Sequence, residues 1–140
     1  MAIGDETGRH HDDALALGWL GFRTGDIPDT NIHISRANAR VLLQRYFAAH
    51  VTVEQVPMAR VEQLLGRALG RALAHELGHY LMASPAHARS GLMRGNQQAD
   101  DFFWPDSRAF DVGDEDLQLV ASAWPRVALS TRPAVATAGG

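Results

Sequence analysis

Residues 57–85 read Pro57-MARVEQLLGRALGRALAHELGHYLMAS-Pro85 and hold the most regular pattern in the chain. Apolar residues recur every three or four positions, and two histidines continue the same stripe: Val61, Leu64, Leu65, Ala68, Ala72, His75 and His79. This spacing predicts a long helix with one buried face. Pro57 suits its first turn, and Pro85 should end it, because the residue before a proline is pushed away from helical geometry. Three arginines mark the expected solvated face: Arg60, Arg67 and Arg71.

The residues before this helix predict strands and a second helix. Residues 14–22 (ALALGWLGF) are apolar and are followed by turn residues, which favours a buried strand. Residues 31–34 alternate in polarity and predict a shorter strand. Ser35 can cap a helix that continues to about His50. The β-branched run at residues 51–53 is a third candidate strand.

The residues after Pro85 predict a loop and a closing helix. The loop contains Gly91 and Gly95, and residues 114–124 begin with acidic side chains, as helices often do. One side of this helix is expected to be buried, through Leu117, Val120 and Ala121. Residues 130–140 are small and contain Pro and Gly, which predicts a disordered tail. The pattern as a whole predicts an α+β fold, with one domain over residues 1–129.

Composition limits the kinds of protein that this chain can be. Its 140 residues, 46% of them hydrophobic, suffice for one core, and a net charge of −3 with scattered arginines predicts neither a nucleic-acid partner nor an anionic membrane partner. No apolar run approaches the roughly 20 residues that cross a bilayer, and residues 1–13 do not resemble a secretory leader. We expect a soluble chain, cytoplasmic as written, or secreted if a leader is missing. There is no cysteine, so any metal site must use nitrogen and oxygen ligands.

The segment His75-Glu76-Leu77-Gly78-His79 carries the chemistry. Positions i and i+4 of a helix lie one above the other, so His75 and His79 can direct their imidazoles at one ion, and neutral imidazole suits zinc. Glu76 projects beside that ion, where it can accept a proton from water without being a ligand.

A catalytic zinc site needs a third protein ligand. His87 is the leading candidate, because the helix break before Pro85 allows the chain to turn back. Asp100 and Asp101 are alternative carboxylate ligands, and a site without a third ligand is the remaining interpretation.

The run His75-Glu76-Leu77-Gly78-His79-Tyr80-Leu81, then His87, then Gly91-Leu92-Met93, resembles the metzincin zinc peptidases, and within them the matrixin-like pattern. The likeness covers about residues 75–93 and is that of a small, divergent, bacterial-type member. It implies His75, His79 and His87 as Zn²⁺ ligands, Glu76 as the general base and Met93 as the methionine beneath the metal. It also implies a small twisted sheet, backed by the long active-site helix, whose edge binds an extended peptide.

The sequence leaves three functions to compare. The first is a zinc-dependent peptidase that acts on a peptide or protein substrate. The second is a non-catalytic, zinc-stabilised module that binds or regulates a partner, since a small domain gains stability from a bound metal. The third is a helical protein in which the motif is fortuitous, and it predicts no stoichiometric metal. The intact glutamate and the placement of both histidines on the buried stripe favour the first.

Overall fold

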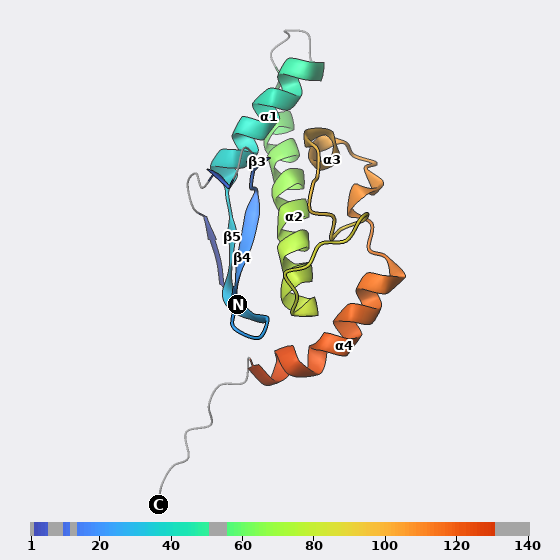
Figure 1. Cartoon of the computed structure of the whole chain (residues 1–140). Helices are drawn as coiled ribbons and strands as arrows, with labels where there is room; N and C mark the ends of the chain where they lie inside the picture. The colour runs from blue at the N-terminus through green and yellow to red at the C-terminus, as the bar shows by residue number, and fades with distance from the viewer. Residues whose placement is uncertain (1, 6–9, 12–13, 51–55, 131–140) are drawn as a thin grey trace, which may run out of the picture.

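The computed structural model describes residues 2–5, 10–11, 14–50 and 56–130, and it has an α+β fold (Figure 1). The strands are β1 (Ala2–Asp5), β2 (His10–His11), β3 (Ala14–Leu15), β4 (Gly18–Arg23) and β5 (Ile27–Ile34). The helices are α1 (Arg36–His50), α2 (Met58–Met82), α3 (Ala99–Phe103), the 3-10 helix η1 (Arg108–Phe110) and α4 (Asp114–Ser130). In Figure 1, α2 lies between the sheet and the segment that carries α3, and α4 packs against α2 near its carboxyl end. None of the described helices is long and apolar enough to cross a membrane.

A small mixed sheet forms one layer of the fold. Its strand order is β1-β5-β4, with β1 parallel and β4 antiparallel to β5, so that β4 is an edge strand. Gly18 pairs with Ile34, and the register shifts between Leu20 and Phe22. The inward residues of β5, Ile32 and Ile34, are buried against the helices. The strands β2 and β3 form a separate two-stranded ribbon.

The predicted capping role of Ser35 is confirmed. Its hydroxyl accepts a hydrogen bond from the backbone N–H of Asn38 at 3.2 Å, which satisfies a donor in the first turn of α1. Asn38 in turn donates from its side-chain amide to the carbonyl of Ala16 at 2.8 Å. This bond ties α1 to the bend between β3 and β4, where the apolar run at residues 14–22 is interrupted. The prediction of one continuous strand there is therefore wrong.

The long helix α2 provides the axis of the core. Its buried stripe includes His79 and four of the predicted apolar positions: Leu64, Leu65, Ala68 and Ala72. These four apolar side chains pack with Ile32, Ile34, Leu43 and the fully buried Phe103. The helix ends at Met82, because Ala83 adopts the left-handed conformation with φ of 47° and its N–H turns back to the carbonyl of Tyr80. The helix therefore ends before Pro85, as expected, and it ends in a left-handed turn at Ala83.

Two arginines expected on the solvated face of α2 bind backbone instead. Arg67 donates to the carbonyl of Phe103 at 2.7 Å. Arg71 donates to four carbonyls, those of Asp101, Phe102, Trp104 and Pro105. The prediction is wrong for these two residues because α3 is short, and its carboxyl-terminal carbonyls need donors from elsewhere. Arg60 is exposed, as predicted.

Other boundaries differ from the expectations or lie outside the described residues. The strand predicted at residues 31–34 begins earlier, at Ile27. The closing helix extends to Ser130, so the expected domain boundary at 129 falls inside α4. Its buried residues are Ala123 and Val127; of the three predicted residues, Val120 is half-buried against a core cluster, whereas Leu117 and Ala121 are exposed. The candidate strand at residues 51–53 and the tail at 131–140 are not among the described residues.

Three glycines on α2 give a matched test of this packing. A Cβ at Gly66 or Gly70 would enter open space, whereas a Cβ at Gly78 would collide with the sulfur of Met93, a side chain that is only 2% exposed. We expect Gly66→Ala and Gly70→Ala each to stabilise the fold by about 0.5–1 kcal/mol, through helix propensity. Gly78→Ala should instead destabilise it by about 1–3 kcal/mol, because a packed side chain must move. Urea denaturation of the metal-free protein measures all three, and equal stabilisation by all three would contradict the packing described.

Candidate metal centre

Three imidazoles converge at the carboxyl end of α2. One ring nitrogen from each of His75, His79 and His87 lies within 4.8 Å of the other two. The Nε2 atom of His79 is 3.1 Å from that of His75 and 3.3 Å from that of His87. The structure therefore brings together the three histidines that the motif singled out.

These separations fit a tetrahedral zinc ion. With Zn–N bonds of about 2.0–2.1 Å and tetrahedral angles, two ligand nitrogens are about 3.3–3.4 Å apart. The two Nε2 distances agree with that value to within a few tenths of an ångström. Three imidazoles also leave a fourth tetrahedral position for a non-protein ligand.

Two backbone carbonyls fix the orientation of the helical histidines. The Nδ1 atom of His75 donates to the carbonyl of Leu92 at 2.7 Å, and that of His79 donates to the carbonyl of Ser84 at 2.8 Å. A carbonyl oxygen can only accept, so both Nδ1 atoms carry the proton and each neutral ring keeps a lone pair on Nε2. Such bonds are typical of metal-ligating histidines.

The electrostatics of the site keep these rings neutral. Burial lowers the pKa of His75 and lowers that of His79 to about 4, more than the hydrogen bonds to Leu92 and Ser84 raise them. Two neutral rings then face each other with lone pairs 3.1 Å apart and no proton between them. A cation held between the lone pairs removes this repulsion, and the donor set therefore suits a metal ion.

A compact turn returns His87 to the helix. The backbone N–H of Ser84 donates to the carbonyl of His79 at 3.2 Å, and the N–H of Ala88 donates to the carbonyl of Met93 at 2.8 Å. The second bond closes residues 88–94 into a loop. Gly95 leaves room for the ring, since a Cβ there would lie 3.0 Å from Cγ of His87. The proline after Ser84 thus lies within a tight reversal that directs His87 towards the other two imidazoles.

Met93 packs directly beneath the helical part of the site. Its side chain contacts Gly78, the residue just before His79, and belongs to a small apolar cluster with Met82 and Leu92. This places an apolar floor under the histidines. That Met93 lies beneath a bound metal remains a prediction from the resemblance.

Glu76 lies on the side of α2 that faces the sheet. It is 8% exposed, and a Cβ added to Gly18 of β4 would lie 2.9 Å from its Cγ. Burial alone raises the pKa of Glu76 to about 7. A carboxylate with a pKa near neutrality is suited to accept and release a proton at physiological pH.

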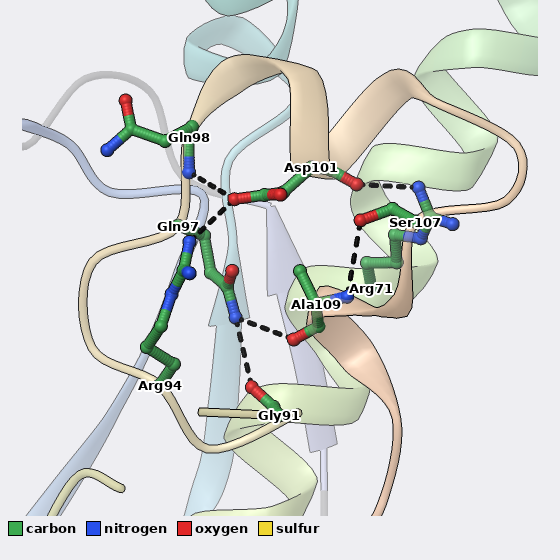
Figure 2. Close-up of polar contacts among 8 residues, drawn as sticks. All are labelled: Arg71, Gly91, Arg94, Gln97, Gln98, Asp101, Ser107 and Ala109. Atoms are coloured by element: carbon green, nitrogen blue, oxygen red, sulfur yellow. Dashed lines mark hydrogen bonds and ion pairs between the residues drawn. The ribbon is translucent and has the colours of Figure 1, made fainter. Parts of the chain in front are cut away.

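The two alternative ligands are occupied in other contacts. Asp100 pairs with Nε2 of His50 at 2.8 Å. Asp101 pairs with Arg94 at 2.6 Å and accepts from the backbone N–H of Gln98 at 2.8 Å, which caps α3 (Figure 2). Among the described residues, the group of potential ligands contains three histidines and neither aspartate.

Several residues beside the site gave no signal in the sequence. Phe22 of β4 meets the ring of His79 edge-on, with centroids 6.4 Å apart, and Gly18 of the same strand contacts Glu76. The carbonyls of Ser84 and Leu92 belong to the backbone, which every residue has.

Comparison of the chain with protein-family models, with curated proteins and with solved structures finds no match. The resemblance to metzincins therefore remains a prediction from the motif.

The ligand set can be tested by metal analysis. We expect purified wild-type protein to carry one zinc per chain, His87→Ala to lose it and Asp100→Ala to keep it, because only His87 directs a nitrogen at the cluster. Elemental analysis after dialysis measures the stoichiometry. Zinc retained by His87→Ala and lost from Asp100→Ala would reverse the assignment.

The metal-free protein should show an unusual pH dependence. Glu76 binds its proton more tightly when folded than when unfolded, so its burial opposes folding above pH 7, and this cost fades as the pH falls from about 7 towards 4.5. His79 acts oppositely, because its lowered pKa removes stability as the pH falls below about 6.5. In the presence of a chelator, Glu76→Gln should be more stable than wild type by about 1–3 kcal/mol at pH 8, with a smaller difference at pH 5. Urea denaturation at the two pH values measures this, and a difference that grows towards pH 5 would contradict it.

Proposed function

We propose that this chain is a zinc-dependent peptidase. The observation that carries the proposal is the convergence of three imidazoles, in which Nε2 of His79 lies at tetrahedral spacing from Nε2 of both His75 and His87. Two of the rings also have their Nδ1 protons committed to backbone carbonyls. A buried carboxylate with a pKa near 7 follows the first of these histidines directly in the sequence. A metal activator and a proton acceptor in one site are the parts that peptide hydrolysis needs.

Each residue has a defined task in this mechanism. A bound zinc would polarise the scissile carbonyl and lower the pKa of a coordinated water towards 7. Glu76 takes the proton of the attacking water and delivers it to the departing amine. His75 and His79 hold their rings in place through Leu92 and Ser84, so that little reorganisation is needed during the reaction.

The surroundings support an extended peptide as the substrate. β4 is the edge strand of the mixed sheet, and its Gly18 and Phe22 contact Glu76 and His79. A sheet edge binds extended peptides by adding a strand. A cavity of about 630 Å³ also borders His87 and Met93 and continues to the start of α4. Glu76 does not line this cavity, so the sheet edge supports an extended peptide substrate more strongly than the cavity does.

One observation favours the non-catalytic zinc module. Glu76 is 8% exposed and packs under Gly18, which restricts the access of a substrate to its carboxylate. In that case the zinc would stabilise the fold, and the domain would bind or regulate a partner. The module predicts that zinc-loaded protein is stable and has no peptidase activity.

Substitution of Glu76 separates these functions. We expect Glu76→Gln to bind zinc with wild-type stoichiometry while its kcat/KM for peptide cleavage falls at least about 100-fold, because the proton acceptor is lost. Glu62→Gln is the matched control, since Glu62 lies on the exposed part of the same helix and pairs with Arg36 at 2.7 Å. A fluorogenic peptide library identifies a substrate, and cleavage of that substrate measures kcat/KM.

Two results would contradict the peptidase proposal. Full activity of Glu76→Gln would remove its proton-transfer role. Zinc-loaded wild type that cleaves no member of the library, and unfolds when the zinc is chelated, would favour the non-catalytic module.

A further inference from the structure

The carbonyl that orients His75 belongs to a loop that needs support. Leu92 accepts the Nδ1 proton of His75 through its carbonyl, and its own N–H donates to the carbonyl of Asp111 at 2.9 Å. The loop at Leu92 is therefore hydrogen-bonded to α2 on one side and to the residue that follows η1 on the other. A shift of this loop by a few tenths of an ångström would change the hydrogen bond that holds the ring.

Gln97 joins the two sides of this contact. Its amide Nε2 donates to the carbonyl of Gly91 at 3.2 Å and to the carbonyl of Ala109 at 3.1 Å. Figure 2 shows the amide between the two backbone segments, with one dashed line to each. Gly91 precedes Leu92, and Ala109 lies two residues before Asp111. The two bonds thus clamp the loop and η1 beside the point where Leu92 meets Asp111.

The Oε1 atom of Gln97 lies at the other end of the side-chain amide. This atom is buried and has no hydrogen-bond partner among the described residues. A buried acceptor without a partner costs free energy, and the two bonds that the NH₂ group makes offset this cost. Both of those bonds go to backbone carbonyls, one in the loop that contains Leu92 and the other in η1.

Arg71 fixes the end of α3 and the residues of η1 to α2. It lies one helical turn before His75, and its guanidinium donates to carbonyls on both sides of the end of α3. The same group lies over the ring of Phe110, 5.3 Å from its centroid. The segment that Gln97 clamps is therefore fixed to the same helix that carries His75.

We propose that Gln97 is a positioning residue of the metal centre. By tying Gly91 to Ala109 it holds the Leu92 carbonyl where it accepts the Nδ1 proton of His75, and it thereby keeps the Nε2 lone pair directed at the ion. This inference rests on the proposed zinc site. It concerns metal affinity and geometry, and it can be tested without any peptidase assay.

The test uses Gln97→Met, which keeps the length of the side chain and removes both donated bonds. We expect the zinc dissociation constant, measured by competition with a chromophoric chelator, to rise about 10–100-fold. The visible spectrum of the Co²⁺-substituted protein should shift, because the geometry of one ligand is altered. In the metal-free protein, long-range ¹H–¹⁵N NMR should show His75 changing from the Nδ1–H tautomer to a mixture of the two tautomers.

Two controls separate positioning from loss of stability. Leu43→Ala removes a buried side chain, 3% exposed, from α1 and destabilises the fold without touching the loop or η1. It should leave the Co²⁺ spectrum and the His75 tautomer unchanged. Gln118→Met makes the same chemical change on the exposed face of α4 and should alter neither. If Gln97→Met does not fold, Gln97→Ala serves instead, because its methyl group can donate to neither carbonyl.

The outcomes distinguish this inference from the proposed function. Tight zinc binding by wild type, with an unchanged dissociation constant, Co²⁺ spectrum and tautomer in the Gln97 variant, would overturn the role of Gln97 and leave the metal site standing. Wild type that binds no zinc would overturn the metal site and this inference together. A spectrum that shifts as much in Leu43→Ala as in Gln97→Met would assign the effect to stability and reject positioning.

Discussion

The arrangement around α2 depends on two hydrogen bonds in which imidazoles donate to backbone carbonyls. The bond from His79 to Ser84 requires the chain to turn sharply after Met82, and the bond from His75 to Leu92 requires it to return along the same helix. Both needs are met by local features, which are the left-handed Ala83 and the short loop closed between Ala88 and Met93. Because these bonds leave the two Nε2 lone pairs facing each other, the same constraint that shapes the turn also brings together nitrogens that are close enough to hold a metal ion.

The two regions that flank α2 contact different residues of the site. On one side, the sheet contributes Gly18 and Phe22, which confine Glu76 and His79. On the other side, α3 and η1 support the loop that holds His75, and they are fixed to α2 through Arg71. The burial that perturbs the pKa of Glu76 and the support that orients His75 therefore come from different parts of the chain. Substitutions in the two parts should affect the pKa of Glu76 and the orientation of His75 separately.

Residue spacing predicted the parts of this structure that depend on periodicity. The buried stripe of α2, the Ser35 cap and the presence of a closing helix follow from spacing and cap chemistry that one segment contains by itself. The buried face of α4 was predicted only in part: Val120 packs against a core cluster, but Leu117 is exposed although it is as apolar as the buried Val127, and only the tertiary packing decides between them. Arg71 was placed on the solvated face for a similar reason. Its partners are backbone carbonyls about 30 residues along the chain, and because every residue has a carbonyl, the sequence does not indicate which ones Arg71 contacts.

The candidate metal centre is also unusually local. All three imidazoles and both carbonyls that orient the helical pair lie between His75 and Leu92, and the supports at Arg71, Gln97 and Asp111 are close in the chain. Closing short loops costs little chain entropy, and contacts of low sequence separation form quickly during folding. The turn that carries His87 can thus assemble on α2 before β4 docks beside it. We therefore expect a folding order in which the histidines gather first and the edge strand covers Glu76 afterwards.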